Sequence, residues 1–472
     1  MFGRRILMAG AAVLSLAAGL PALAEPVKLR LVSKDLSLSN PQDVAHVDRI
    51  EAALAARGTE VEIEIVDVAS SGYADKLTAM ILAGDIPDLI YFQGGDAKIA
   101  EQGVLEDLRP WIEKSEFLKD ALHPHNRDRL ENYPYLLYVF PVRNPQPVMR
   151  KDWFERTGLP APQTLDDYVA LLTAVAQGDY DGNGKADTLG LTAAETTAEL
   201  DAIFNRAFGV DASWLKGPEG FINARVSPQE RDKIAFYAML REKGLLDVEY
   251  ITTKWDVKED KFYSGRVGMI LGSSAEVVDI YGGKMRQVHP GVELVLFDPP
   301  QGPAGRGLAA VDVSKESRGF AISALSGNKE AAFAVLDFMA SPEGQVMDRM
   351  GFEGEEYVTK DGKVEVTDKI ATWYARFMVA ANWTTPVQWL SPPAQQHLAN
   401  VSAFYVADNA FVWPPEYAAD LDATTNVYRE WVFKFVSGEA GMDQWDAYVA
   451  AWNAAGGERL TAHAREVLDA TN

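Results

Sequence analysis

The sequence predicts an α/β protein with two lobes, in which each lobe has a mostly parallel sheet flanked by helices. Three observations support this fold class. Strand-like and helix-like segments alternate near the N-terminus, turn-rich segments interrupt the chain further on, and 47% of the 472 residues are hydrophobic. A chain of this length and apolar content has enough material for two domains of ordinary size. We therefore expect two packed cores.

The first segments of the chain alternate between strand and helix. Val27–Val32 (VKLRLV) and Val61–Val68 (VEIEIVDV) have the period of two that is typical of strands, and residues 44–56 between them have helical spacing. A second helical stretch at 73–83 is followed by the apolar run 88–92. The order β-α-β-α-β predicts an open parallel sheet, and ligands of such sheets bind at the carboxyl ends of the strands.

The remainder of the chain is richer in helix. Spacing and capping signals predict helices at 164–176, 201–208, 228–243, 329–340 and 442–452, and strands at 267–271 and 318–323. Hinge-like crossings follow 139–142 and lie at 299–303. We therefore expect a first lobe made of 25–142 plus about 300–352, and a second lobe made of 143–299 plus about 353–472.

The N-terminus has the pattern of a secretory signal peptide. Arg4 and Arg5 precede an apolar run from Ile6 to Leu20, and Ala22-Leu-Ala24 follows as a small-residue cleavage site. The run is short for a membrane span, and no stop-transfer charges follow it. We therefore expect residues 1–24 to be removed and the mature protein to be soluble in the periplasm.

Charge and cysteine content exclude several kinds of site. The sequence has no cysteine and a formal net charge of −23. Disulfides, thiolate metal sites and thiol nucleophiles are therefore excluded, and phosphate backbones or anionic lipid surfaces are repelled. We expect no nucleic-acid binding, no membrane insertion and a monomeric protein.

The strongest local motif is the acidic loop DYDGNGKAD, which follows a predicted helix. It matches the first nine positions of an EF-hand loop, with oxygen ligands at alternate positions. The ligands are Asp179, Asp181, Asn183, the main-chain carbonyl of Lys185, and Asp187. Gly190 stands at position twelve, where an EF-hand has a bidentate Glu. We expect a structural Ca²⁺ loop over 179–190 rather than a sensor, and a solvated acidic turn is the alternative.

Four stretches, in their order and spacing behind a signal peptide, carry a resemblance to a known family. They are Ala83–Phe92 with Gly103–Leu108, Met149–Phe154 with Pro162–Asp167, Gly265–Ile270, and Phe435–Gly438 with Trp445–Tyr448. Together they resemble the extracellular solute-binding proteins of ABC importers, in particular the large carbohydrate-binding group. The resemblance covers nearly the whole mature chain. It implies a type II binding-protein clamp whose interleaved lobes close on a ligand and present it to the transmembrane subunits of a permease.

The same resemblance bears on the acidic loop. Some alginate-type members of the family carry a calcium loop beside the corresponding helix, which implies Ca²⁺ as a structural cofactor. Those members tend to have an acidic residue directly after the last Asp of the loop, where this chain has Thr188. We therefore expect a water or a hydroxyl to complete the calcium shell.

Sugar sites combine aromatic faces with side chains that hydrogen-bond to hydroxyl groups. The resemblance places Phe92 where relatives have a stacking ring, and Lys34 and Asp35 where they have polar contacts. The remaining candidates lie after predicted strands, at the crossings, on helices of the second lobe and in C-terminal aromatic clusters. The full set of expected ligand-binding residues is Lys34, Asp35, Phe92, Gln93, Asp96, Arg143, Asn144, Asn205, Phe208, Ser274, Arg318, Trp383, Trp413 and Asn426.

One departure from the family pattern concerns the stacking platform. Many sugar-binding relatives have a Trp soon after the stretch that ends at Ile270, where this chain has Gly272-Ser-Ser274. Another ring, for instance that of Trp383, Trp389 or Trp413, would then supply the platform.

The ligand could also carry a charge. Four cations, Lys34, Arg143, Arg206 and Arg318, would make the cleft locally basic and would suit a uronate-containing sugar. The alternative is that some of them form salt bridges at the surface.

Two other functions are weighed against a sugar-binding importer subunit. A peptide-binding importer subunit uses the same clamp and holds its ligand through backbone groups. A secreted polysaccharide-degrading enzyme would use paired carboxylates, but the sequence has neither a His-Glu-x-x-His nor a Gly-x-Ser-x-Gly motif. We therefore expect that the protein is not an enzyme.

Overall fold

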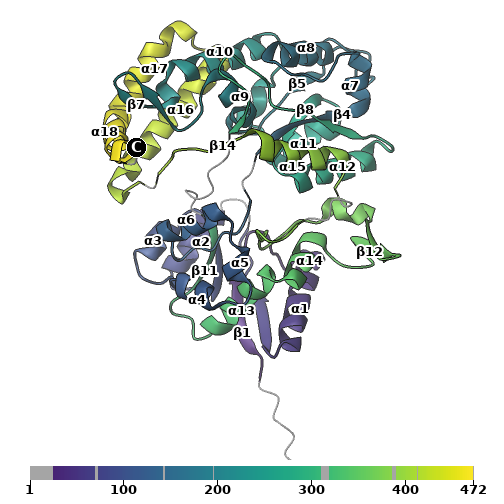
Figure 1. The fold of residues 1–472 in the computed structure, drawn as a ribbon, viewed down its shortest axis with the longest axis vertical. Helices are drawn as coiled ribbons and strands as arrows, with labels where there is room; N and C mark the ends of the chain where they lie inside the picture. Colours follow the sequence, from purple (N-terminus) through teal and green to yellow (C-terminus); the bar gives the residue numbers. More distant parts are fainter. Residues whose placement is uncertain are drawn as a thin grey trace, which may run out of the picture.

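The computed structural model describes residues 25–69, 73–141, 144–194, 196–309, 318–384, 390–411 and 413–470. They form two bodies, one above the other in Figure 1. We call the lower body, made of 25–141 and 318–384, the first lobe, and the upper body, made of 144–309 and 390–470, the second lobe. The expected two-lobed α/β architecture is confirmed. The predicted signal peptide 1–24 lies outside the described residues.

The first lobe is built on a four-stranded sheet in the order β11-β3-β1-β2. β1 (Val27–Val32) runs parallel to β2 (Val61–Ile65) and to β3 (Leu89–Gln93), whereas β11 (Arg318–Ile322) is antiparallel to β3. The other elements of this lobe are α1 (Pro41–Ala56), α2 (Tyr73–Leu82), α3 (Asp96–Ala100), α4 (Arg109–Lys114), α5 (Leu118–Ala121), α6 (Pro124–Asn132), α13 (Lys329–Ala340), α14 (Pro342–Met350), β12 (Tyr357–Lys360), β13 (Lys363–Val366) and the short 3-10 helix η4 (Asp368–Thr372).

The alternation of side chains along the strands gives this sheet a core on each face. In β3, Leu89 and Tyr91 join the core that includes residues of α1 and α13. Ile90 and Phe92 point the other way and join the core that includes residues of α2 and α3. A central strand covered on both faces has this near-continuous apolar sequence.

The 3-10 helix η4 packs against α12 (Ala275–Val288) of the second lobe. Residues 373–383, in contrast, lie with the first lobe, and not with the second as we expected. Phe377 and Met378 belong to the first-lobe core. Arg376 Nε lies 2.7 Å from a carboxylate oxygen of Asp43 in α1, and both side chains are buried. A buried charge without a partner costs several kcal/mol, on the order of 3 to 5 when one partner of a pair is removed. Because Arg376 finds its partner in α1, this segment is fixed to the first lobe.

The second lobe is built on a four-stranded sheet in the order β5-β8-β4-β9. β8 (Val267–Gly272) is parallel to β5 (Leu189–Leu191) and antiparallel to β4 (Gln146–Arg150), which is antiparallel to β9 (Leu294–Leu296). The expectation of a mostly parallel sheet is therefore wrong for this lobe. Gln146, the first residue of β4, pairs with Gly272, the last residue of β8, so these two strands run in opposite directions.

Helices and short strands surround this second sheet. They are α7 (Lys151–Thr157), α8 (Leu165–Ala176), α9 (Ala198–Phe208), β6 (Trp214–Gly217), β7 (Gly220–Asn223), η1 (Ala224–Val226), α10 (Pro228–Glu242), η2 (Val248–Ile251), α11 (Trp255–Tyr263), α12 (Ala275–Val288), β10 (Leu308–Ala309), α15 (Pro392–Phe404), β14 (Tyr405–Val406), η6 (Pro415–Tyr417), α16 (Ala418–Ser437), η7 (Met442–Gln444), α17 (Trp445–Trp452), the π-helical segment η8 (Asn453–Gly457) and α18 (Glu458–Ala470).

Residues 300–309 also belong to the second lobe, whereas we expected them in the first. β10 pairs with β14, and Leu308 is part of the second-lobe core. The chain therefore passes between the lobes after residues 141, 309 and 384. In the part of the chain that the structure describes, no helix is long and apolar enough to cross a membrane.

The buried pair in the first lobe gives a stability prediction. Arg376→Met should lower the free energy of unfolding by about 3 kcal/mol or more, because Asp43 is left buried without its cation. Lys360→Met is the control, since Lys360 pairs with Glu365 in the same lobe and both side chains are exposed. It should cost no more than about 1 kcal/mol in urea unfolding followed by circular dichroism. Equal, small losses for the two variants would contradict this role of Arg376.

Candidate functional site

Two cavities border the points where the chain crosses between the lobes, and each has a volume of about 480 Å³. The interlobe cavity is lined by residues of both lobes, including Phe140 and Pro141 next to the first crossing. Among the described residues, the second-lobe cavity is lined by that lobe alone, including Ala309 just before the second crossing. A movement of one lobe against the other would therefore displace residues that line each cavity.

The interlobe cavity brings the loop after β1 together with the start of α12. Lys34 Nζ and a carboxylate oxygen of Asp35 lie 2.5 Å apart at this cavity. Ser274 is the N-cap of α12, and its hydroxyl accepts a hydrogen bond from the Val277 N–H at 3.3 Å. Both loops follow the carboxyl end of a strand, which is where an open α/β sheet places its ligand contacts.

An ion pair joins the two lobes across the interlobe cavity. Arg349 of α14 lies 2.7 Å from Glu276 of α12. Burial by itself would raise the pKa of Glu276, but the Arg349 guanidinium, together with hydrogen bonds from the Glu276 N–H and from Ser274, lowers the pKa below its usual value. The charged form of Glu276 is therefore favoured while the lobes keep this arrangement.

A second carboxyl group of the same cavity behaves in the opposite way. Burial raises the pKa of Asp279 to about 6, although its carboxylate accepts a hydrogen bond from the Ser391 N–H at 3.2 Å. Ser391 lies just after the third crossing. Asp279 therefore titrates near neutral pH at a contact between α12 and a crossing segment.

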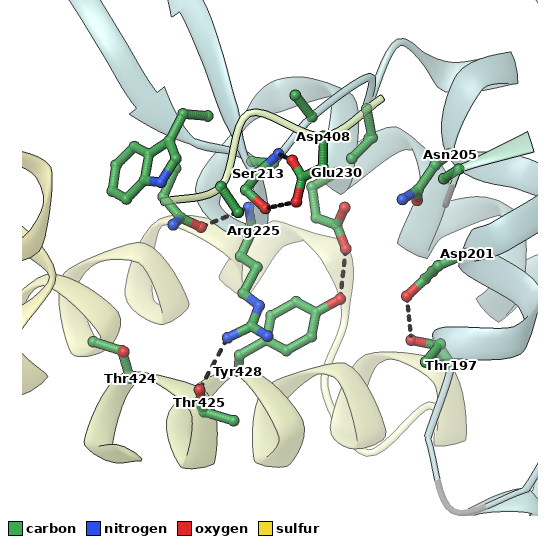
Figure 2. A pocket seen from close by; sticks show the side chains of 18 of the residues that line it. Thr197, Asp201, Asn205, Ser213, Arg225, Glu230, Asp408, Thr424, Thr425 and Tyr428 are labelled. Carbon is green, nitrogen blue, oxygen red and sulfur yellow. Dashed lines mark hydrogen bonds between the residues drawn. The ribbon is translucent and has the colours of Figure 1, made fainter. Parts of the chain in front are cut away.

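The second-lobe cavity mixes aromatic rings with many polar side chains (Figure 2). Its rings come from Trp214, Trp413, Tyr428 and Trp452. The polar groups come from α9, η1, α10, α16 and the segments next to β6 and β14. They include Thr197, Asp201, Asn205, Ser213, Arg225, Glu230, Asp408, Thr424 and Thr425. Rings beside hydroxyl, amide and carboxylate groups are suited to a ligand with both C–H faces and hydroxyls.

A buried lysine organises the polar part of the second-lobe cavity. Lys233 Nζ lies 2.7 Å from Asp201 and 2.9 Å from Glu230, and it donates to the Asn205 side-chain oxygen at 2.6 Å. Burial opposes the charge of Lys233, but Asp201 and Glu230 outweigh it and raise its pKa. The Tyr428 hydroxyl donates to Glu230 at 2.7 Å. These groups are therefore held in fixed positions before any ligand arrives.

Five of the expected ligand-binding residues line one of the two cavities. Lys34, Asp35 and Ser274 line the interlobe cavity, and Asn205 and Trp413 line the second-lobe cavity. Trp413 packs against Trp214 with the ring centres 6.1 Å apart.

Phe92 is fully buried, so the expected stacking ring is not available to a ligand. Its position in β3 directs the side chain into the core beneath α2 and α3. Asn144 is also fully buried, and its amide donates to the Ala309 carbonyl at 3.3 Å. Asp96 is buried at the start of α3 and accepts a hydrogen bond from Tyr135 at 3.0 Å. These three side chains serve the fold, and we correct their assignment.

The remaining candidates that the structure describes line neither cavity. Phe208 packs against Phe236 at 5.4 Å between ring centres, and Trp383 packs against the first-lobe core. Gln93 and Arg318 are paired in register at the ends of β3 and β11. Asn426 lies exposed on α16. Arg143 and Trp389 lie outside the described residues.

Sequence reasoning missed most of the second-lobe cavity, notably Arg225, Lys233 and Tyr428. One signal was present, because Glu230 and Lys233 stand three residues apart on the face of α10 that also carries Ile234. An acid and a base on an apolar helix face point to a buried pair. Tyr428 comes from α16, a helix that the sequence reading did not identify.

The acidic loop folds as a tight turn centred on Asn183. The Asn183 amide donates to Asp181 at 2.8 Å and to Asp187 at 3.0 Å. The Gly184 N–H donates to Asp179 at 3.0 Å, with φ of 85° at Gly184 in the left-handed region that favours glycine. The three carboxylates therefore approach one another around a single turn.

Two buried oxygen atoms of this loop lack a hydrogen-bond partner among the described residues. They are Asp179 Oδ1 and Thr188 Oγ1. No group of three or more His, Cys, Asp or Glu side chains in the described ranges is arranged to hold a metal ion. The loop therefore has a donor set that suits a hard cation, with its side chains hydrogen-bonded to each other in this conformation.

The raised pKa of Asp279 predicts a pH effect on stability. The folded protein keeps the Asp279 proton up to about pH 6, whereas the unfolded chain loses it near the usual value of 3.8. Its contribution to stability is therefore fully present below about pH 4 and is lost as the pH rises through about 6. Relative to Asp279→Asn, the wild type should lose about 2 kcal/mol of unfolding free energy between pH 4 and 6.5. Urea unfolding across this range checks it, with Asp166→Asn as an exposed control on α8, and a constant difference between wild type and Asp279→Asn would contradict it.

Comparison with known proteins places the chain among transport-related binding proteins. The family model described as bacterial extracellular solute-binding protein matches residues 46–346, nearly two thirds of the chain. Polygalacturonan/rhamnogalacturonan-binding protein YtcQ of Bacillus subtilis is 22% identical over 447 residues, which cover 85% of this chain and 84% of that protein. Lipoprotein LipO of the same species is 24% identical over 64% of this chain, and the match spans 63% of LipO.

Solved structures show the same fold. Alginate-binding protein AlgQ2, solved without calcium ion, matches with a TM-score of 0.70 at 18% identity over 95% of this chain and 99% of that one. The substrate-binding protein FusA of S. pneumoniae in complex with kestose matches with a TM-score of 0.66 at 18% identity over 95% and 99%. Because the family model spans more than half of the chain and the two-lobed fold agrees, the chain belongs to the bacterial extracellular solute-binding proteins.

Proposed function

We propose that the protein is the substrate-binding subunit of an ABC importer and that it captures a sugar or oligosaccharide in the second-lobe cavity. The observation that carries this proposal is the lining of that cavity. Trp413 offers a half-buried ring in the same cavity as the amide of Asn205 and the hydroxyl of Thr425. Aromatic faces cover the C–H side of a pyranose, while amides, hydroxyls and carboxylates bond its hydroxyl groups.

Capture would work by closure of the lobes about their crossings. A ligand shifts such an equilibrium only if it binds the closed arrangement better than the open one, so a saccharide held in the second-lobe cavity would contact the first lobe once the lobes close. The interlobe cavity supplies groups from both lobes that a closing movement would rearrange, including Lys34 on the first lobe and Ser274 on the second. The ligand then leaves chemically unchanged, and the closed form is what the transmembrane subunits of the importer would recognise.

The names of the similar proteins support a saccharide as the ligand. YtcQ is named for polygalacturonan and rhamnogalacturonan, and FusA of Streptococcus pneumoniae, 26% identical over 306 residues, is named for fructooligosaccharides. The FusA match spans 54% of that protein and the LipO match 63%, so these relatives support the class of ligand and not one sugar. The extracellular family agrees with export through the expected signal peptide 1–24 and with action in the periplasm.

A ligand screen tests the proposal. Neutral and acidic oligosaccharides and a peptide mixture are offered, with thermal unfolding, solution scattering and product analysis as readouts. A saccharide should raise the melting temperature, reduce the radius of gyration and be recovered intact. Stabilisation by peptides alone would contradict the proposal, and so would the release of cleaved sugar.

Trp413→Ala should weaken the affinity for that saccharide about fivefold, since a stacked ring contributes about 1 kcal/mol. Trp111→Ala is the matched control, because Trp111 is half-buried in the first lobe and lines neither cavity. An unchanged affinity in Trp413→Ala, measured by calorimetry on folded protein, would remove this ring from the site.

We also propose that the loop 179–190 binds a structural Ca²⁺ ion. Asp179, Asp181, Asn183 and Asp187 would supply side-chain oxygens and Lys185 its carbonyl, which are the ligand types of the first nine EF-hand positions. The unpartnered Oδ1 of Asp179 supports this assignment. One similar structure is that of the alginate-binding protein AlgQ2 without calcium ion, and another is that of an EF-hand mutant of FusA, which adds to the case. The ion would connect the end of α8 at Ala176 to the start of β5 at Leu189.

Chelation tests the calcium proposal. EDTA should lower the melting temperature, and Ca²⁺ should restore it. Asp181→Asn should abolish the response to Ca²⁺, whereas Asp166→Asn, an exposed change on the preceding helix, should keep it. A melting temperature indifferent to EDTA would contradict the proposal.

A further inference from the structure

Three of the acids at the second-lobe cavity are paired with cations. Lys233 is held between Asp201 and Glu230, and Arg206 Nη1 at the end of α9 lies 2.6 Å from Asp211. Two cations and three carboxylates carry a net formal charge of −1, and each of the three carboxylates is already in contact with a cation. A ligand therefore senses the remaining charged side chains of the cavity.

Asp408 is also engaged by its surroundings. Its carboxylate accepts hydrogen bonds from the Ser213 N–H and hydroxyl, both at 2.7 Å, and from the Asn409 N–H at 2.8 Å. These three donors stabilise the negative charge of the Asp408 carboxylate. This carboxylate fixes the segment before β6 and is not directed at a cation.

Arg225 differs from the other charged groups of the cavity. Its Nη1 donates to the Thr425 hydroxyl at 3.0 Å, and its guanidinium carbon lies 4.7 Å from the centre of the Tyr428 ring (Figure 2). Neither neighbour carries a negative charge, since Tyr428 is itself a donor to Glu230. Within the described ranges no carboxylate pairs with Arg225, although this side chain is half-buried and lines the cavity.

A guanidinium held on a ring face, with a neutral hydroxyl as its partner, is prepared to receive a carboxylate. The planar group offers parallel N–H donors that match the two oxygens of a carboxylate, and the Tyr428 ring fixes its plane. Arg429 lines the same cavity and adds a second positive charge. A protein with a formal charge of −23 repels anions in general, so an acidic ligand needs such a local cation.

We propose that the second-lobe cavity is specific for a carboxylate-bearing sugar, a uronate, and that Arg225 is the residue that determines this specificity. The inference rests on the proposed sugar-binding function of the cavity and adds the charge of the ligand. The basic group of the site is then Arg225, and not one of the cations expected from the sequence. Arg206 is bound to Asp211, Lys34 to Asp35, and Arg318 Nη1 lies 3.5 Å from the Tyr138 hydroxyl, away from both cavities.

The test compares two ligands that differ in charge and by one methyl group on each sugar unit. The probes are tetragalacturonate and its fully methyl-esterified form, titrated by calorimetry into wild type, Arg225→Gln and Arg231→Gln. Arg231 lies exposed on α10 and lines neither cavity, so it controls for the loss of one positive charge. Wild type should bind the acid at least about tenfold tighter than the ester, and Arg225→Gln should weaken binding of the acid about tenfold or more. Binding of the ester should change less than about twofold in either variant.

Salt dependence in the wild type gives a second readout that does not depend on how the variants fold. The affinity for tetragalacturonate should fall as NaCl rises, while the affinity for the ester should stay constant. Equal affinities for acid and ester in wild type, or equal weakening of both in Arg225→Gln, would overturn the specificity proposal and leave sugar binding intact. Binding of neutral oligosaccharides with no binding of either galacturonate probe would overturn it as well. Failure of every saccharide in the screen would overturn the proposed function itself.

Discussion

The need of each buried charge for a partner holds this molecule together across long stretches of sequence. Arg376 finds its partner Asp43 in α1, and Lys233 lies between Asp201 on α9 and Glu230 on α10. Leaving one such charge unpaired costs on the order of several kcal/mol, which is a large part of the stability of a folded domain. The segments that carry these charges are therefore fixed relative to one another. The positions of the side chains that line the cavities depend on these pairs.

The polar cavity of the second lobe follows from the same constraint. The ion pairs of Lys233 prevent Asp201 and Glu230 from moving toward a ligand, so they act as a rigid floor. Tyr428 is oriented by Glu230 and in turn supports Arg225. A site whose groups are already ordered loses little freedom when a ligand binds, which favours affinity and selectivity. The ligand chemistry proposed for this cavity thus depends on packing that is complete before binding.

The interlobe cavity has a different character, because its groups belong to two bodies. Arg349 and Glu276 form an ion pair between the lobes, and the carboxyl of Asp279 is held neutral up to about pH 6 by burial. These contacts would change whenever the lobes move relative to each other. A binding protein of this family can therefore place rigid recognition in one lobe and the response to the ligand between the lobes.

The sequence by itself determined the local elements and the class of protein, because both are encoded over short distances. The alternation in VKLRLV and VEIEI predicted β1 and β2, and the Thr164 cap predicted the start of α8. The acidic loop and four short stretches indicated the family, which the comparison confirmed. Only the tertiary structure decided that Phe92 faces the core, that 373–383 belongs to the first lobe and that Arg225 meets Tyr428. Those outcomes depend on strand parity and on contacts between segments far apart in the chain, for which a single sequence holds no local signal.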